Sequence, residues 1–192
     1  MIDGKPWIAM FSHTGSEIVN ISKKLGIIPE KVITNNAPGS PDINKQLLSF
    51  HIQPNVVNEI VYSSAKPTAQ DYSRVLTPDA IVTLHGWMRI VPPCICKEYE
   101  IYNLHPGLIT KYPELKGADP QKKVAEEPDE NKYTDIGCVI HRVTAGVDEG
   151  PVLMEASCRK TAYGEANITN RLHEMATGMW VDFMQYKVYN ME

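Results

Sequence analysis

The chain reads Trp7-Ile8-Ala9-Met10-Phe11-Ser12-His13-Thr14-Gly15-Ser16 near its beginning. The first five residues are a short apolar run between polar flanks, which is typical of a buried strand. The next five read as a small polar turn, and an amphipathic helix is expected from about Glu17 to Leu25. A strand, a small-residue loop and a helix in this order predict the opening of a nucleotide-binding type of βα unit.

The chain continues with the same alternation. Further apolar runs read as strands at residues 32–34, 59–62, 79–84 and 100–104, with helical segments between them. Strands that alternate with helices favour a mainly parallel sheet. Ligands of such sheets bind beyond the carboxyl ends of the strands, and Gly15, Gly86 and His105 all fall just after a strand.

The pattern changes in the second half of the sequence. Two apolar runs, Ile136–Val143 and Val152–Cys158, flank the short loop 144–150 and read as neighbouring strands, and a long helix is expected over about Asn167 to Tyr186. We therefore predict an α/β fold with one domain over residues 1–192 and helices on both faces of a Rossmann-like sheet. Residues 1–100 form the Rossmann-like half of this prediction. Residues 101–192 hold the catalytic loop, the late strands and the last helix.

Composition and residue patterns argue against a nucleic-acid-binding, membrane-spanning, secreted or metal-binding protein. The 192 residues carry a formal net charge of −4, so no general attraction for nucleic acid is expected. No stretch reaches the roughly 18 to 20 apolar residues of a membrane span, and the start lacks a secretion signal, so a cytoplasmic location is expected. Cys94-x-Cys96 is too closely spaced for a usual zinc knuckle, and no metal is predicted.

Three blocks of sequence resemble the folate-dependent formyltransferase family in the same order and spacing. Residues 86–91 are similar to its Gly-Phe-Met-Arg-Ile-Leu, residues 103–113 to its Asn-x-His-Pro-x-Leu-Leu-Pro-x-Tyr, and residues 141–152 to its His-x-Val-Thr-x-x-x-Asp-Gly-Gly-Pro-Val. Asn-x-His-Pro by itself would be a weak signal, since a strand end followed by an ordinary turn gives the same letters. Three blocks in register extend the resemblance from about Trp7 to the last helix.

The resemblance implies that Asn103, His105 and Asp148 are the catalytic set. Attack of an amine on a formyl amide creates a tetrahedral carbon with an oxyanion, which an amide N–H of Asn103 and a protonated imidazole of His105 would stabilise. A carboxylate close to the imidazole favours its charged form, and Asp148, or a water that it holds, would take the proton of the amine. This chemistry requires the three side chains to meet around one carbonyl group.

The family resemblance also implies which residues hold the two substrates. Met88, Arg89, Ile90 and Val91 would line the pterin pocket of 10-formyltetrahydrofolate, with His141 nearby, although a plain sheet histidine remains an equal alternative. Gly15, Ser16 and Glu17 are similar to the Gly-Ser-Asn that holds the phosphate of phosphoribosylglycinamide. Glu17 departs from that pattern, because a carboxylate repels a phosphate at short range.

The predicted function is therefore transfer of a formyl group from 10-formyltetrahydrofolate to an amine, with phosphoribosylglycinamide as the first candidate acceptor in purine biosynthesis. A formyltransferase for another amine, such as an amino-sugar nucleotide, or a formyltetrahydrofolate hydrolase, remains an alternative. A non-catalytic folate-binding module is disfavoured because Asn103, His105 and Asp148 are all present. The expected partners are the two small substrates, and the chain is expected to be a monomer or a homodimer.

Overall fold

The computed structural model describes residues 5–49, 59–161 and 164–189. The chain divides into two compact units. The first unit comprises the chain up to Tyr102 together with the chain from Met184 onwards, and the second unit is Asn103–Phe183. The prediction of one domain over the whole chain stays a prediction.

Five strands belong to the first unit in whole or in part: β1 (Trp7–Phe11), β2 (Lys31–Thr34), β3 (Glu59–Tyr62), β4 (Ile81–His85) and the first half of β5 (Glu100–His105). β1 lies between β2 and β4, β3 pairs with β2, and all three pairings are parallel. All residues of β1 and β4 are buried. Buried residues, all apolar except Thr83 and His85, therefore fill these central strands, much as the apolar runs predict.

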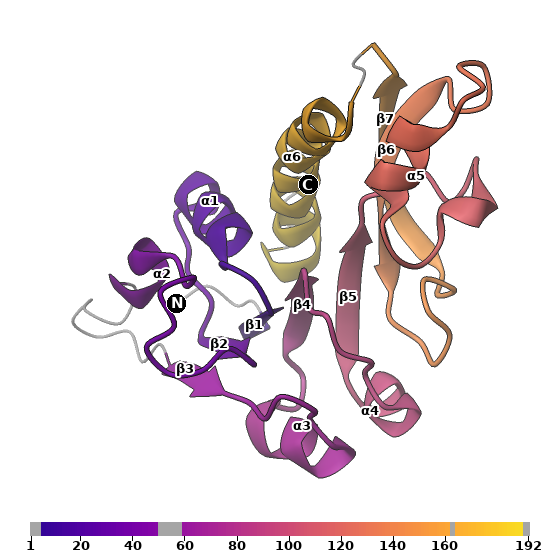
Figure 1. Ribbon diagram of the computed structural model, residues 1–192. Coiled ribbons are helices and arrows are strands. Elements are labelled where there is room, and N and C mark those ends of the chain that lie inside the picture. The colour runs from indigo at the N-terminus through magenta and orange to yellow at the C-terminus, as the bar shows by residue number, and fades with distance from the viewer. Residues whose placement is uncertain (1–4, 50–58, 162–163, 190–192) are drawn as a thin grey trace. The chain divides into compact units, whose positions relative to one another are not determined.

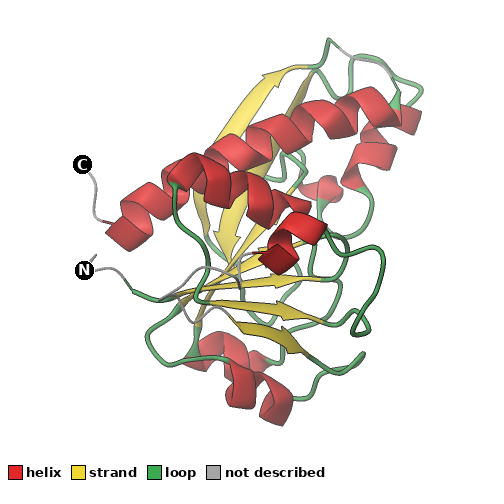
Figure 2. Ribbon diagram, turned by 90° about the vertical axis from the view of Figure 1, so that its left-hand side faces the viewer, coloured by secondary structure: helices red, strands yellow, loops and turns green. Residues whose placement is uncertain are grey.

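Four helices connect these strands: α1 (Ser16–Leu25), α2 (Lys45–Ser49), α3 (Ala69–Val75) and α4 (Pro93–Glu98). α1 and α2 lie on one face of the strands and α3 and α4 on the other (Figure 1, and from another side in Figure 2). Gly15 begins α1 with φ 72°, and an added Cβ atom would lie 2.6 Å from Leu47 Cδ2, so the turn after β1 requires glycine.

The second unit contains the end of β5, the helix α5 (Pro120–Glu126), the strands β6 (Asp135–Arg142) and β7 (Val152–Arg159), and α6 (Glu165–Tyr189) as far as Phe183. β6 and β7 form an antiparallel hairpin. The Sγ of Cys138 in β6 contacts the carbonyl oxygen of Leu172 at 3.7 Å, so α6 packs against this strand. A short 3₁₀ turn, Pro113–Leu115, precedes α5.

The predicted fold class is confirmed. The strand order is β3-β2-β1-β4-β5-β6-β7, and helices connect strands that are mainly parallel. The last helix is longer than expected, since it runs from Glu165 to Tyr189. Among the described residues, no helix is both long and apolar enough to cross a membrane.

Candidate active site

Two buried histidines and one largely buried carboxylate meet in the second unit. Asp148 Oδ2 lies 3.2 Å from His105 Nδ1, and Asp148 Oδ1 lies 3.2 Å from His141 Nε2. The backbone N–H of Gly117 donates to Asp148 Oδ2 at 2.9 Å. The exposed fractions of the side chains are 5 % for His105, 3 % for His141 and 9 % for Asp148. The carboxylate has therefore exchanged water for three nitrogen partners.

These contacts set the charge of Asp148. Burial by itself disfavours the ionised carboxylate, but the hydrogen bonds from His105 and His141, the charge of His105 and the N–H of Gly117 together lower the pKa of Asp148 far below its usual range. The carboxylate is thus ionised throughout the neutral range. A fixed negative charge at this depth favours a positive charge on an adjacent ring.

The ring of His105 lies between two acceptors. Its Nδ1 faces the carboxylate of Asp148, and its Nε2 lies 2.8 Å from the carbonyl oxygen of Leu115. A neutral imidazole has only one N–H, so both acceptors are satisfied only when the ring carries two protons. The proposed role of His105 as an oxyanion donor requires such a ring, with an N–H on each nitrogen.

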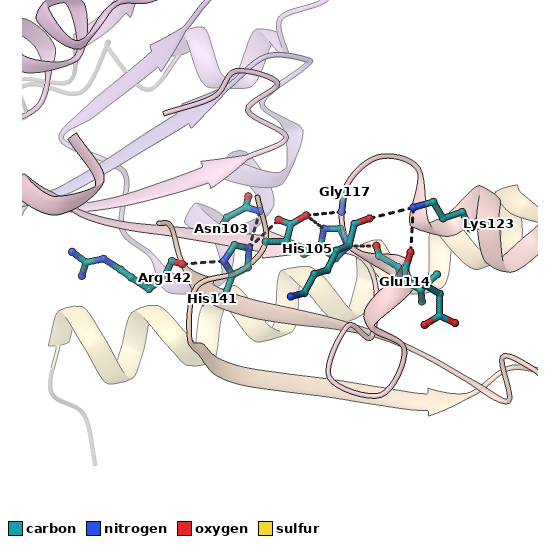
Figure 3. A network of polar contacts seen from close by, with 10 residues as sticks. Asn103, His105, Glu114, Gly117, Lys123, His141 and Arg142 are labelled. Carbon is teal, nitrogen blue, oxygen red and sulfur yellow. Dashed lines mark hydrogen bonds and ion pairs between the residues drawn. The ribbon is translucent and has the colours of Figure 1, made fainter. Parts of the chain in front are cut away.

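His141 Nε2 lies close to both a hydrogen-bond acceptor, the Asp148 carboxylate, and a hydrogen-bond donor, the Asn103 amide. Its Nδ1 lies 3.0 Å from the carbonyl oxygen of Arg142, while its Nε2 lies 3.2 Å from Asp148 Oδ1 and 3.3 Å from Asn103 Nδ2. With a lone pair at Nε2 the ring accepts from Asn103, and with a proton there it donates to Asp148. Whether Nε2 of His141 binds Asn103 or Asp148 therefore depends on the tautomer of the ring. Figure 3 shows Asn103, His105 and His141 pointing toward one another.

The segment 114–117 supplies backbone atoms to the site. Leu115 gives its carbonyl oxygen to His105, and Gly117 gives its N–H to Asp148. Lys123 in α5 fixes this segment, because its Nζ donates to the carbonyl oxygens of Glu114 at 3.4 Å and Lys116 at 3.2 Å (Figure 3). The loop after β5 is thus held both by α5 and by the reactive side chains.

The loop between β6 and β7 places Asp148. Asp148 has φ 52°, a left-handed conformation that aspartate tolerates better than most residues. Arg142 N donates to the carbonyl oxygen of Pro151 at 3.0 Å, which closes the loop. A Cβ atom on Gly150 would overlap the carbonyl oxygen of Arg142, the atom that also accepts from His141. Glycine at position 150 therefore allows the close approach that orients His141.

Of the three predicted catalytic residues, His105 and Asp148 are in direct contact, and Asn103 is connected to Asp148 through His141. The catalytic roles stay predictions. His141, expected near the pterin, is a member of this cluster by direct contact. Sequence reasoning missed Leu115 and Gly117, because main-chain atoms can contribute hydrogen bonds whatever the side chain is.

The predicted pterin residues form the loop after β4 in the first unit. Met88 and Ile90 are 59 % and 69 % exposed, while Val91 is buried. The guanidinium of Arg89 donates to the carbonyl oxygens of Ala65 at 2.5 Å and Met88 at 2.7 Å, so it fixes the loop. Two exposed apolar side chains on a fixed loop suit contact with a flat heterocycle. Binding of a pterin there stays a prediction.

The predicted acceptor residues lie at the carboxyl end of β1 in the first unit. Ser16 Oγ contacts Thr14 Oγ1 and Asn44 Nδ2, both at 2.9 Å. Glu17 Oε2 lies 2.7 Å from Nδ1 of His85, whose side chain is 1 % exposed while that of Glu17 is 28 % exposed. The unexpected carboxylate at position 17 therefore has an internal partner. The buried His85 at the end of β4 is that partner.

A sequence signal for this pair exists. His85 ends β4 and Glu17 follows β1, and the two strands are parallel neighbours with Phe11 beside His85. Groups that follow adjacent parallel strands meet at the same edge of the sheet.

Among the described residues, no group of three or more His, Cys, Asp or Glu side chains is arranged to hold a metal ion.

Part of the sequence is similar to that of a known protein. Over 113 residues the chain is 32 % identical to phosphoribosylglycinamide formyltransferase of Escherichia coli K12, a match that covers 54 % of this chain and 50 % of that protein. The chain thus spans about half the length of this curated relative. This match by itself therefore does not assign the activity of the whole relative to this chain.

Solved structures share the fold. Phosphoribosylglycinamide formyltransferase from Anaplasma phagocytophilum superposes with a TM-score of 0.73 at 22 % identity, covering 94 % of this chain and 85 % of that chain. A formyltetrahydrofolate deformylase from Pseudomonas syringae pv. tomato gives a TM-score of 0.69 at 22 % identity, covering 92 % and 58 %. Residues 13–183 match the family described as formyl transferase. Since this match covers most of the sequence, the protein belongs to the formyl transferase family.

Proposed function

We propose that this protein transfers the formyl group of 10-formyltetrahydrofolate to an amine, with phosphoribosylglycinamide as the acceptor. The observation that carries the proposal is the contact of Asp148 with both His105 and His141, and of His141 with Asn103. Membership of the formyl transferase family supports the reaction. The relative from E. coli, a phosphoribosylglycinamide formyltransferase, supports the acceptor.

In the proposed reaction the acceptor nitrogen attacks the formyl carbon and forms a new C–N bond. The carbonyl oxygen becomes an oxyanion. Asn103 has two amide N–H groups, of which one faces His141, and the other is proposed to donate to the oxyanion. His105 keeps its Nδ1 on Asp148 and moves its Nε2–H from the Leu115 carbonyl to the oxyanion. Each such donor contributes a factor of about 10² to 10³ in rate.

The proposed reaction assigns to Asp148 the removal of a proton from the amine. The attacking amine loses one proton, which Asp148 or a water that it holds receives. The bond between the formyl carbon and N10 of the folate then breaks, and that nitrogen takes a proton as it leaves. The products are a formamide and tetrahydrofolate, so atoms and charge balance without a metal or a redox partner.

Glu17 favours a second acceptor class. The resemblance to the family assigns a phosphate to the position where this chain carries a carboxylate that is 28 % exposed. Like charges at short range repel, so an amine without a phosphate at this position, such as one on an amino-sugar nucleotide, is the alternative acceptor. Water as the nucleophile would turn the same cluster into a hydrolase of the folate.

One assay separates these outcomes. Tetrahydrofolate release is followed by absorbance from the 10-formyl donor with phosphoribosylglycinamide, with a panel of other amines, and with no amine. Release that requires phosphoribosylglycinamide supports the proposal, whereas release without any amine identifies a hydrolase. His105→Ala, Asn103→Ala and Asp148→Ala should each lower turnover at least about 10²-fold. His173→Ala, at an exposed histidine, is the matched control; near-wild-type rates in all three test variants contradict the mechanism.

A further inference from the structure

The strand β7 ends the described strand order, and no described strand lies on its outer side (Figure 1). Alternate side chains along it are exposed, at residues 153, 155, 157 and 159. Leu153 is 47 % exposed and the preceding Val152 is 37 % exposed. An open strand edge with exposed apolar residues is a template for pairing with another chain. The direction of the backbone hydrogen-bonding groups and the charged side chains of β7 indicate which chain pairs with it.

The register of the hairpin determines which backbone groups of β7 point outward. Cys158 lies opposite Ile136 and Ala156 opposite Cys138 in the antiparallel pairing. Lys160 N donates to the carbonyl oxygen of Thr134, so the even-numbered residues of β7 hydrogen-bond to β6. Hydrogen-bonding groups alternate in direction along a strand. The N–H and C=O groups of residues 155, 157 and 159 therefore point away from β6.

The charges on this edge are complementary to themselves. Glu155 and Arg159 lie two residues on either side of Ser157, on the same face of the strand. When a second copy of β7 pairs antiparallel with Ser157 opposite Ser157, each Glu155 lies opposite the partner's Arg159. A shift that centres the pairing on residue 155 or 159 instead places like charges opposite each other. Opposite charges across a strand pair stabilise it and like charges destabilise it, so one register is selected.

The contacts that Glu155 and Arg159 make within their own chain leave both charges available for this pairing. Thr110 Oγ1 donates to one carboxylate oxygen of Glu155 at 2.5 Å, and the carboxylate remains exposed. Arg159 lies opposite Asp135, but Asp135 also forms an ion pair with Lys111. In the same register, the exposed Leu153 lies opposite the partner's Thr161. The edge thus presents a hydrogen-bonding row, two complementary charges and an apolar side chain.

We propose that the protein forms a homodimer through antiparallel pairing of β7 with β7 of a second copy, centred on Ser157 and specified by two Glu155–Arg159 ion pairs. Because β7 and β6 flank the loop of Asp148, this pairing also supports the hairpin that carries the candidate catalytic carboxylate. The dimer is independent of the acceptor and of the proposed reaction.

Charge reversal tests the register directly. Analytical ultracentrifugation of the wild type should give twice the mass of the chain. Glu155→Lys and Arg159→Glu should each raise the dimer dissociation constant by about tenfold or more, since both ion pairs become repulsive. An equimolar mixture of the two variants should again give a dimer, because every 155–159 pair is then of opposite sign. Glu126→Lys, a charge reversal at an exposed position of α5, should leave the wild-type mass unchanged.

A backbone variant provides the second arm. Ser157→Pro removes the central outward N–H, and proline is tolerated on a strand edge where the N–H faces solvent. This variant should be monomeric and should keep the circular dichroism spectrum of the wild type. A monomeric wild type at its highest soluble concentration overturns the proposal. So does a dimer that survives both Ser157→Pro and the separate charge reversals.

Discussion

Among the described residues, Asp148 with His105 and Glu17 with His85 are two histidine–carboxylate pairs that differ in what surrounds the carboxylate. In the second unit, Asp148 lies between two histidine rings and one backbone N–H, and its side chain is 9 % exposed. In the first unit, Glu17 contacts His85, and its side chain is 28 % exposed. Asp148 comes from a loop that converges with other segments, whereas Glu17 sits in the first turn of a helix.

The two pairs also end differently. His85 Nε2 lies 2.8 Å from Thr83 Oγ1, which accepts from Trp7 Nε1 at 2.7 Å, so this chain of contacts runs into the core. His105 and His141 end instead on the main-chain carbonyl oxygens of Leu115 in the 3₁₀ turn and of Arg142 at the end of β6, and His141 also meets the amide of Asn103. A histidine–carboxylate contact is therefore insufficient as a sign of catalysis. In the candidate site, by contrast, His141 Nε2 can either accept a hydrogen bond from Asn103 or donate one to Asp148, so more than one hydrogen-bond pattern is possible.

The largest effect should come from removing the charge of Asp148. Asp148→Asn keeps the shape but loses the proposed acceptor of the amine proton and the negative charge beside His105, so turnover should fall by about 10²- to 10⁴-fold. The matched change Glu17→Gln should leave kcat within about threefold of wild type. Steady-state release of tetrahydrofolate measures both. Equal losses in the two variants would erase the contrast between the pairs.

A smaller loss is expected from a variant that touches no reacting group. In Gly150→Ala the new methyl group overlaps the Arg142 carbonyl oxygen, which must move away from His141 Nδ1. Because a misplacement of about 1 Å costs up to 10²-fold in rate, turnover should fall by roughly tenfold while folding is retained. Gly178→Ala in α6 is the control, since an added Cβ atom there meets no neighbour. Unchanged turnover in Gly150→Ala would mean that the loop does not orient the cluster.

The sequence was sufficient for the strands and helices because these depend on local apolar patterns. The run 79–84 predicts a central strand, and β4 is found at Ile81–His85. The meeting of residues 103, 105 and 148 was inferred from the resemblance, since no local pattern places two distant loops together. The contacts of Leu115 and Gly117 involve main-chain atoms and leave no mark on residue type.

The Glu17–His85 pair is not predicted by either segment of sequence alone. In the sequence, Glu17 stands out only as a departure from the phosphate-binding pattern of the family, and no local pattern connects it with His85. Their contact depends on the lateral order of the strands, in which β1 and β4 are neighbours and leave His85 beside Phe11. Strand order is set by packing of the whole unit and is only weakly encoded in any one segment.

Acid should weaken the folded state through Asp148. The pKa of Asp148 is lowered in the folded protein, so the folded state holds fewer protons there than the unfolded state. The stability that this group contributes is present above the unfolded pKa of about 3.9 and is lost as the pH falls below it. Melting temperatures from pH 6 to pH 2 should fall more steeply for wild type than for Asp148→Asn. Parallel curves would show that the carboxylate is not stabilised by its neighbours.

The smallest effect should come from stability measurements on the pair in the first unit. In Glu17→Gln the amide oxygen still accepts from His85 Nδ1, but the hydrogen bond loses its charge, so the free energy of unfolding should fall by about 1 kcal/mol. In His85→Ala the imidazole is removed from a buried site, and Thr83 and Glu17 both lose a partner, so the loss should be larger, about 2–4 kcal/mol. Urea denaturation measures both values, with Glu126→Gln as an exposed control. If Glu17→Gln destabilised the protein as much as His85→Ala, the charge of Glu17 itself would be structural, and its role would resemble that of Asp148 more closely than the exposed fractions indicate.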